Sequence, residues 1–219
     1  MSSLPKHTVL SIAATIAIAS PQAGAAILYF PDEDIPIPSN FSGVSVDLET
    51  GQTSTALDGI PNGDANFFFG GAELSNDADS SVATPSWQPV RAGAGNTDIA
   101  LNLPVGAVVD ASGASSAAGS DYASGFGSSG DATAHFPEFT PGTRGYLGFS
   151  LVPNAGGAPL FGWVEVTLQT QASGLEGTIH SWAYESDPGM SIMVGAIPEP
   201  ATASLALLGA LGFALRRRR

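Results

Sequence analysis

The segment FGWVEVTL (residues 161–168) changes side-chain character with the two-residue period of a β-strand. One face of this predicted strand carries Val164, Val166 and Leu168, and the opposite face carries Trp163, Glu165 and Thr167. A second segment beginning at Phe41 has the same period, with Val44, Val46 and Leu48 opposite Ser45, Asp47 and Glu49. Both segments are predicted to be strands with one buried side.

Six further segments have strand-like composition between Gly, Pro, Asn and Asp residues: 26–30, 65–69, 98–103, 146–152, 178–184 and 191–194. No long stretch shows the apolar spacing of a helix. Eight short strands with turns between them predict an all-β fold, a single jelly-roll-like β-sandwich over residues 26–196. Residues 106–134 hold 21 Gly, Ala or Ser among 29 positions, which predicts a long flexible loop within it.

The charge of this predicted domain is strongly negative. The chain of 219 residues has 20 acidic and 7 basic residues, and five of the basic ones lie near its ends. Residues 26–197 carry 19 acids against Arg91 and Arg144, a formal charge of −17. Nucleic acid is therefore a poor partner. The absence of Cys excludes disulfides, thiol nucleophiles and iron–sulfur clusters.

The N-terminal 25 residues have the organisation of a secretory signal peptide. Lys6 and His7 precede an apolar run over residues 8–19. Ala23 and Ala25 then supply the small side chains that a signal peptidase requires, which predicts cleavage before Ala26. A core helix is the alternative, but the order of charge, apolar helix and small residues favours export by the general secretory route.

The C-terminal segment, residues 197–219, begins with the tripeptide Pro198-Glu199-Pro200. The two prolines keep the chain extended and open to a processing enzyme. Fifteen mostly apolar residues follow (201–215), and as a helix they would reach about 22 Å, short of the ~30 Å hydrocarbon core of a bilayer. The basic tail of Arg216, Arg217, Arg218 and Arg219 would extend this short transmembrane helix by snorkelling and stay cytoplasmic.

This C-terminal segment resembles the PEP-CTERM sorting signal of Gram-negative bacteria. The resemblance covers about 22 residues and implies that exosortase, a membrane protease-transpeptidase, recognises Pro198, Glu199 and Pro200. It further implies that Arg216 to Arg219 retain the chain in the inner membrane during processing, usually in organisms that make exopolysaccharide. A plain membrane anchor with an accidental tripeptide is the alternative.

The body resembles a group of exported PEP-CTERM proteins without assigned biochemistry. Five stretches carry the resemblance: residues 40–44, 48–51, 145–149, 162–166 and 182–185. It implies an extracellular β-sandwich and transfers no activity. Trp163, Trp182 and Tyr184 are interpreted as core and rim residues, with a sugar-stacking platform as the alternative.

A degenerate calcium loop is the one candidate cation site. Asp58, Asn62, Gly63 and Asp64 fit an Asp/Asn-rich loop, but Ile60 replaces a ligand and Phe69 stands where a closing Glu belongs. An Asn-Gly-Asp turn before a strand explains the same residues. A second acidic cluster, formed by Asn76, Asp77 and Asp79, is interpreted as a solvated loop. No cofactor is therefore predicted, with Ca²⁺ as the candidate to test.

No catalytic residue is predicted. The carboxylates Glu138, Glu165, Glu176 and Glu185 cannot be paired from sequence, and Glu165 is interpreted as a strand residue on the solvent side. His135 and His180 are isolated and are interpreted as loop or strand residues. No nucleophile elbow, phosphate loop or His pair occurs, and residues 26–219 contain no Lys for Schiff-base chemistry.

These observations predict an exported, non-enzymatic cell-surface or extracellular-matrix protein that exosortase sorts and processes. The inner membrane would be its transient partner and exopolysaccharide a further one. An extracellular glycan-binding module of the same fold is the alternative hypothesis, and a secreted hydrolase is the third.

Overall fold

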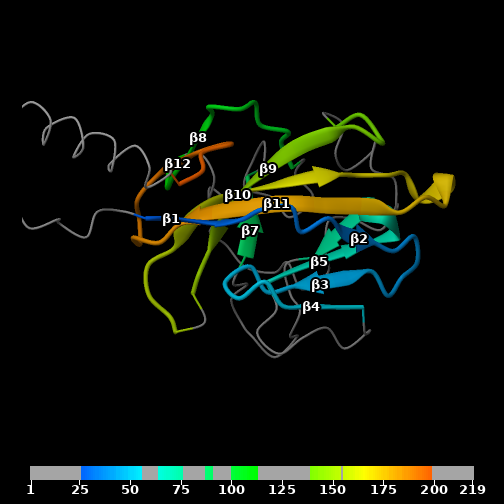
Figure 1. Ribbon diagram of the computed structural model, residues 1–219, viewed down its shortest axis with the longest axis horizontal. Coiled ribbons are helices and arrows are strands. Elements are labelled where there is room, and N and C mark those ends of the chain that lie inside the picture. Colours follow the sequence, from blue (N-terminus) through cyan, green and yellow to red (C-terminus); the bar gives the residue numbers. More distant parts are fainter. Residues whose placement is uncertain are drawn as a thin grey trace, which may run out of the picture.

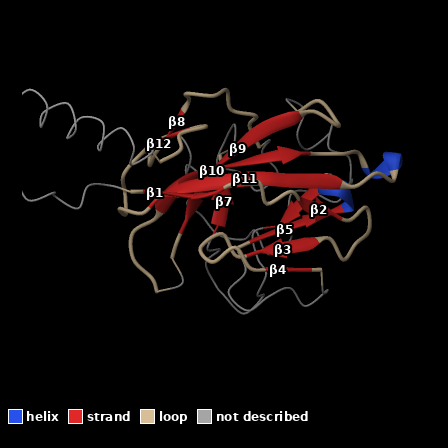
Figure 2. Ribbon diagram, in the orientation of Figure 1, coloured by secondary structure: helices blue, strands red, loops and turns tan. Residues whose placement is uncertain are grey.

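The computed structural model describes residues 26–55, 64–75, 87–90, 100–112, 139–153 and 155–198. Within these ranges the regular elements are β-strands apart from two short 3-10 helices, η1 (Phe69–Gly71) and η2 (Gln171–Ser173) (Figure 2). The prediction of an all-β class is therefore confirmed for the described residues. The jelly-roll-like path of the strands stays a prediction.

The larger sheet has three long antiparallel strands at its centre, β9 (Arg144–Leu151), β10 (Leu160–Thr167) and β11 (Gly177–Glu185) (Figure 1). β1 (Ile27–Phe30) and β2 (Ile35–Ile37) both pair with the outer side of β11. β7 (Trp87–Pro89) pairs with β9 at the opposite edge. The strand predicted from residues 161–168 thus lies in the middle of the sheet.

The remaining strands form two smaller antiparallel units. A four-stranded sheet has the order β4 (Thr53–Ser54), β3 (Val44–Val46), β5 (Ala65–Phe68) and β6 (Glu73–Ser75). A two-stranded ribbon pairs β8 (Val108–Val109) with β12 (Ile192–Met193). We call this unit the β8–β12 ribbon.

The larger and the four-stranded sheets share one hydrophobic core. Its buried members include Leu147, Phe149, Val164, Val166, Leu168 and Trp182 from the larger sheet and its margin, and Val44, Val46, Phe67 and Leu74 from the smaller one. This confirms that Val164, Val166 and Leu168 form a buried face. Trp182 stacks on Phe30 with ring centroids 4.7 Å apart, and its Nε1 donates to the carbonyl of Leu48 at 3.0 Å. The indole therefore ties β11 to the segment that follows β3.

A second core lies on the other face of the larger sheet, so the prediction of one buried side is wrong for β10. Phe161 and Trp163 are buried there beneath Val109, Ile192 and Val194 of the β8–β12 ribbon and its C-terminal neighbour. Alternation indicates which side chains share a face. It does not indicate whether another segment covers that face, and here the ribbon does.

The prediction of one buried side is also wrong for β3. Ser45 and Asp47, on the face opposite the hydrophobic core, are buried as well. Ser45 is hydrogen-bonded to Asn66 of the neighbouring β5, and the Asp47 carboxylate accepts bonds from the amides of Glu49 and Thr50. Burial is tolerated here because these polar groups are satisfied by near neighbours.

The prediction that the flexible loop begins at residue 106 is wrong. Val108 and Val109 form β8, and Val109 is fully buried in the second core. Two valines suffice to pair with β12, although the composition around them is dominated by Gly, Ala and Ser. Residues 113–134, the larger part of the predicted loop, lie outside the described residues.

The other strand predictions have mixed outcomes. Residues 26–30, 65–69, 146–152, 178–184 and 191–194 each contain an observed strand. The predicted strand 98–103 is wrong where it is described, because Ala100 forms an isolated bridge and residues 101–103 have no strand assignment. The sequence interpretation missed β2, β4, β6, β7 and β8, which are two or three residues long.

The predicted signal helix (1–25) and the predicted transmembrane helix (201–215) fall outside the described residues. Within the part of the chain that is described, no helix has the length and apolar character needed to cross a bilayer.

Candidate functional site

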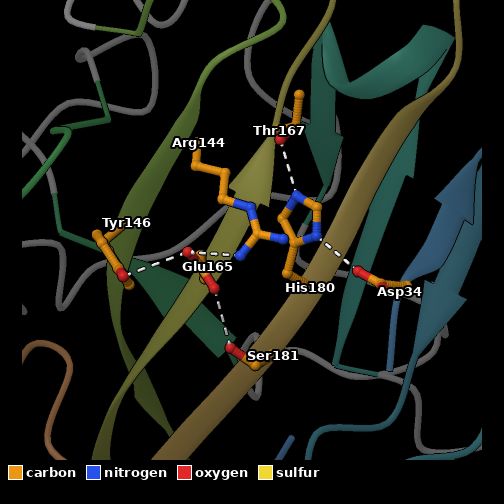
Figure 3. A network of polar contacts seen from close by, with 7 residues as sticks. All are labelled: Asp34, Arg144, Tyr146, Glu165, Thr167, His180 and Ser181. Carbon is orange, nitrogen blue, oxygen red and sulfur yellow. Dashed lines mark hydrogen bonds and ion pairs between the residues drawn. The ribbon is translucent and has the colours of Figure 1, made fainter. Parts of the chain in front are cut away.

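The polar surface of β9, β10 and β11 gathers the most extensive side-chain network of the described residues. At its centre the Glu165 side chain is only 14% exposed. Its Oε1 accepts bonds from Arg144 Nη1 at 3.2 Å and from the Tyr146 hydroxyl at 3.3 Å, and its Oε2 accepts one from Ser181 Oγ at 3.3 Å (Figure 3). The interpretation of Glu165 as a solvent-side residue is therefore corrected, because three neighbouring side chains cover it.

A β-bulge in β11 places two consecutive side chains on this surface. Ser181 pairs with Glu165, whereas the next pair along the ladder is Val166 with Ile179, so His180 is the extra residue. Both His180 and Ser181 contact β10 residues of the same face (Figure 3). Bulges commonly re-aim a side chain in this way.

The re-aimed His180 bridges two side chains that are far apart in the sequence. Its Nε2 lies 2.8 Å from the Thr167 hydroxyl, and its Nδ1 lies 2.7 Å from Oδ1 of Asp34 (Figure 3). The Asp34 backbone has a positive φ of 41°, and the preceding Glu33 amide donates to the carbonyl of His180 at 2.9 Å. The bulge and the β1–β2 connection therefore hold each other in place.

The Thr167–His180–Asp34 chain has the connectivity of a nucleophile, a base and an orienting carboxylate. Acyl transfer also requires hydrogen-bond donors for an oxyanion beside the nucleophile. Thr167 lies between Arg144 of β9 and Thr178 of β11, so its backbone belongs to the two ladders of the sheet. In the described structure these three side chains connect β10, β11 and the β1–β2 connection by hydrogen bonds.

The network changes the pKa of Tyr146. Burial raises the pKa of Tyr146 above the usual 10.0; the charge of Glu165 and its hydrogen bond raise it further, and Arg144 opposes the rise. A raised folded-state pKa contributes stability that is present below pH 10.0 and lost as the pH rises through the folded-state pKa.

Tyr146→Phe is expected to lower the free energy of unfolding by about 1 kcal/mol near neutral pH, because the hydrogen bond to Glu165 is lost. This deficit should shrink as the pH passes 10.0, since Phe has no proton to lose. Urea unfolding of both proteins across the alkaline range measures it. A deficit that is independent of pH would contradict the prediction.

The carboxylates considered from sequence do not form a catalytic pair in the described structure. Glu165 pairs with Ser181, and Glu185 lies four positions further along β11, about 13 Å away at strand spacing. Glycoside hydrolases hold two carboxyl groups roughly 5–10 Å apart across a cleft, whereas the Glu165 carboxylate is bonded to Arg144, Tyr146 and Ser181. Glu185 is buried and accepts a bond from the Asp187 amide, and Glu176 is exposed directly before β11. Glu138 and His135 lie outside the described residues.

Of the candidate calcium loop, Asp64 alone is described. Its carboxylate is fully buried, and Oδ2 accepts a bond from the Leu48 amide at 2.7 Å. Phe69 starts η1 with a positive φ of 51°. Within the described ranges no three His, Cys, Asp or Glu residues gather as a metal site would require. Calcium at this loop stays an untested candidate, because Asp58, Asn62 and Gly63 lie outside the described residues. The cluster of Asn76, Asp77 and Asp79, interpreted as a solvated loop, lies outside them as well.

The aromatic residues proposed for sugar stacking are buried. Trp163, Trp182 and Tyr184 are each no more than 5% exposed, which confirms core packing and removes them as a stacking platform. Sequence reasoning did not single out Phe41, which is 63% exposed and stacks on Phe68 with centroids 5.7 Å apart. Exposure of one Phe in a turn has no sequence signal of its own.

The described body ends directly beside the predicted sorting tripeptide. The carbonyl of Ala196 accepts a bond from Trp163 Nε1 at 3.2 Å. The amide of Ala196 donates to the carbonyl of Met193 at 2.9 Å. Ile197 and Pro198 are exposed beyond this point, and Glu199, Pro200 and Arg216 to Arg219 lie outside the described residues. The chain therefore leaves the second core at Ala196.

The opposite end of the body begins near the same place. Ala26, the predicted first residue of the mature protein, is exposed and accepts a bond from the Ser186 amide at 3.0 Å. Ala23 and Ala25 lie outside the described residues. β1 and β12 lie on the same side of the molecule in Figure 1, so the described chain enters and leaves at one end.

Comparison with known families identifies this C-terminal region. The model of the PEP-CTERM protein-sorting motif matches residues 196–219. The chain carries a PEP-CTERM sorting motif. The matched range contains Pro198-Glu199-Pro200, the apolar run and the four arginines, as the resemblance implied. Such a motif implies export, a membrane-anchored sorting intermediate and exosortase as the processing partner.

No curated protein and no solved structure shows significant similarity to the chain.

Proposed function

We propose that this protein is an exported, non-enzymatic component of the cell surface or extracellular matrix, which exosortase processes at its PEP-CTERM motif. The observation that carries the proposal is the position of the motif. The match begins at Ala196, the residue that Trp163 fixes to the body, and the next two residues are exposed. The tripeptide thus starts at an exposed residue, Pro198, which suits a processing site.

The polar surface supports a structural role over catalysis. Glu165 has three hydrogen-bonding partners and His180 has two, and all come from adjacent strands or from the β1–β2 connection. Groups used in this way stabilise a sheet surface. An acidic domain with a hydrogen-bonded sheet surface of this kind suits a matrix in which exopolysaccharide is the surrounding polymer.

Replacing Pro198, Glu199 and Pro200 with alanines is expected to stop processing, because the recognition element is removed while the body is untouched. The unprocessed chain should accumulate in the inner-membrane fraction with residues 201–219 still attached. Membrane fractionation and mass spectrometry of both protein ends measure this outcome, and the same spectra reveal any attached glycan.

The matched control replaces Pro31 and Glu33 with alanine. These residues are also an exposed Pro and Glu, but they lie in the β1–β2 connection and outside the motif. The control should be processed like the natural chain. Normal processing of the tripeptide variant would contradict the proposed role of Pro198-Glu199-Pro200.

A further inference from the structure

The β8–β12 ribbon and its flanking residues expose an unusual number of apolar side chains. Eight large hydrophobic residues are exposed in the described structure, and four of them lie in the short segments 105–108 and 193–197. Each of the four is more than half exposed. We call this set the ribbon face; it consists of Val105, Val108, Met193 and Ile197.

The members of the ribbon face lie on neighbouring segments. Val108 and Met193 are direct partners across β8 and β12, and both point outward while their neighbours Val109 and Ile192 are buried. A Cβ on Gly195 would lie 3.2 Å from the side chain of Val105, so that valine covers the chain just before Ile197. The Gly106 amide donates to the carbonyl of Val194 and fixes this arrangement.

The ribbon face also lacks charge in a body that is otherwise acidic. Residues 100–109 and 188–198 contain no Asp, Glu, Lys or Arg, whereas residues 26–197 carry a formal charge of −17. Contiguous exposed apolar surface bordered by polar residues marks a contact site for protein or membrane. An uncharged apolar surface fits the neutral interfacial layer of a bilayer.

The sequence places this surface next to the membrane while the C-terminal tail spans it. Trp163 holds Ala196 on the body, and the predicted span starts at Ala201. The five steps from Ala196 to Ala201 reach at most about 18 Å. The interfacial layer on each side of a bilayer is itself roughly 5–8 Å thick. The tether therefore keeps the ribbon face at the bilayer surface, where a high effective concentration favours even a weak contact.

We propose that the ribbon face rests on the lipid surface in the sorting intermediate, with Val105, Val108, Met193 and Ile197 in the headgroup layer. The contact orients the body so that Pro198-Glu199-Pro200 lies at the membrane surface, within reach of a membrane-embedded processing enzyme. This proposal rests on the membrane-anchored intermediate that the motif implies. Cleavage of the tail removes the tether and releases the face.

The absence of Cys allows a direct test. Val108→Cys and Met193→Cys each introduce a single thiol for a nitroxide spin label. Leu175→Cys is the matched control, since Leu175 is as exposed as Val108 but follows η2, at the end of the molecule opposite the β8–β12 ribbon (Figure 2). The full chain is reconstituted into phosphatidylcholine vesicles, and the accessibility of each label to oxygen and to a water-soluble nickel complex is measured.

The expected result is a severalfold higher ratio of oxygen to nickel accessibility at positions 108 and 193 than at position 175. Equal, water-like ratios at all three positions overturn the proposal. Spin–spin broadening at position 108 that grows with protein density also overturns it, because a second copy of the chain would then cover the face. Protection that requires added exosortase assigns the face to a protein partner and overturns it as well.

Carbonate extraction of the same vesicles separates this proposal from its premise. If the chain is extracted, the tail does not anchor it and the account of the sorting intermediate fails. If the chain resists extraction and position 108 is water-exposed, the anchor holds and the lipid contact alone is refuted.

Discussion

Trp182→Ala is expected to remove about 3–5 kcal/mol of folding free energy, a large fraction of the stability of an ordinary domain. The indole is fully buried, stacks on Phe30 and belongs to the core that joins the two larger sheets. Its removal leaves a cavity where strands distant in the sequence meet. The urea midpoint followed by far-UV circular dichroism measures the loss.

Trp182→Phe separates packing from hydrogen bonding. The phenyl ring keeps part of the stacking on Phe30 but cannot donate to the Leu48 carbonyl, which Nε1 of Trp182 reaches at 3.0 Å. A buried carbonyl without a donor costs about 1–3 kcal/mol, so this variant should fall between the natural chain and Trp182→Ala. Leu175→Ala, at an exposed position, should stay within about 0.5 kcal/mol. A loss for Trp182→Ala as small as that for Leu175→Ala would contradict the assignment of Trp182 to the core.

The long strands could be predicted because their side chains have a clear period. Val164, Val166 and Leu168 share a face in the sequence and are buried together in the structure. The covered state of Trp163 could not be predicted in this way, since it depends on Val109 and Ile192, which come from two other parts of the chain. A two-residue strand in a segment rich in Gly, Ala and Ser is too short to show a period.

The sorting motif could be predicted from the sequence, whereas the polar network could not. Pro198-Glu199-Pro200, the apolar run and the arginines are contiguous, so their order alone identifies them. The contact between Asp34 and His180 joins residues 146 positions apart, and only the folded sheet brings them together. His180 appears isolated in the sequence for this reason.

The spacing of core residues in β11 accounts for the bulge once the structure shows which core each residue faces. Ile179 and Trp182 are both apolar but three positions apart, and both are buried in the same core. A regular strand would place them on opposite faces. An odd spacing between two core residues of one strand therefore predicts a bulge between them, and with it the outward position of His180.

Deleting one residue from β11 is expected to destabilise the protein far more outside the bulge than at the bulge residue itself. Deletion of Ala183 should abolish folding, because Tyr184 would turn away from the main core and Glu185 would turn into it. Loss of a large core side chain costs about 3–5 kcal/mol, and an unpaired buried carboxylate costs several more. Together these terms match the whole stability of a typical domain, about 5–15 kcal/mol.

Deletion of His180 removes the extra residue and leaves Ile179, Ser181 and Trp182 in regular alternation, so both core side chains keep their face. The losses are the contacts with Thr167 and Asp34 and the bond from the Glu33 amide. Because Asp34 is largely exposed, these contacts contribute little, and the expected cost is within about 3 kcal/mol. Urea unfolding and near-UV circular dichroism of the two deletion variants compare them. Losing the unpaired His180 keeps the two-residue alternation of β11, whereas losing the paired Ala183 reverses it for the residues that follow. Equal destabilisation by the two deletions would therefore contradict the role of the bulge in deciding which side chains face the core.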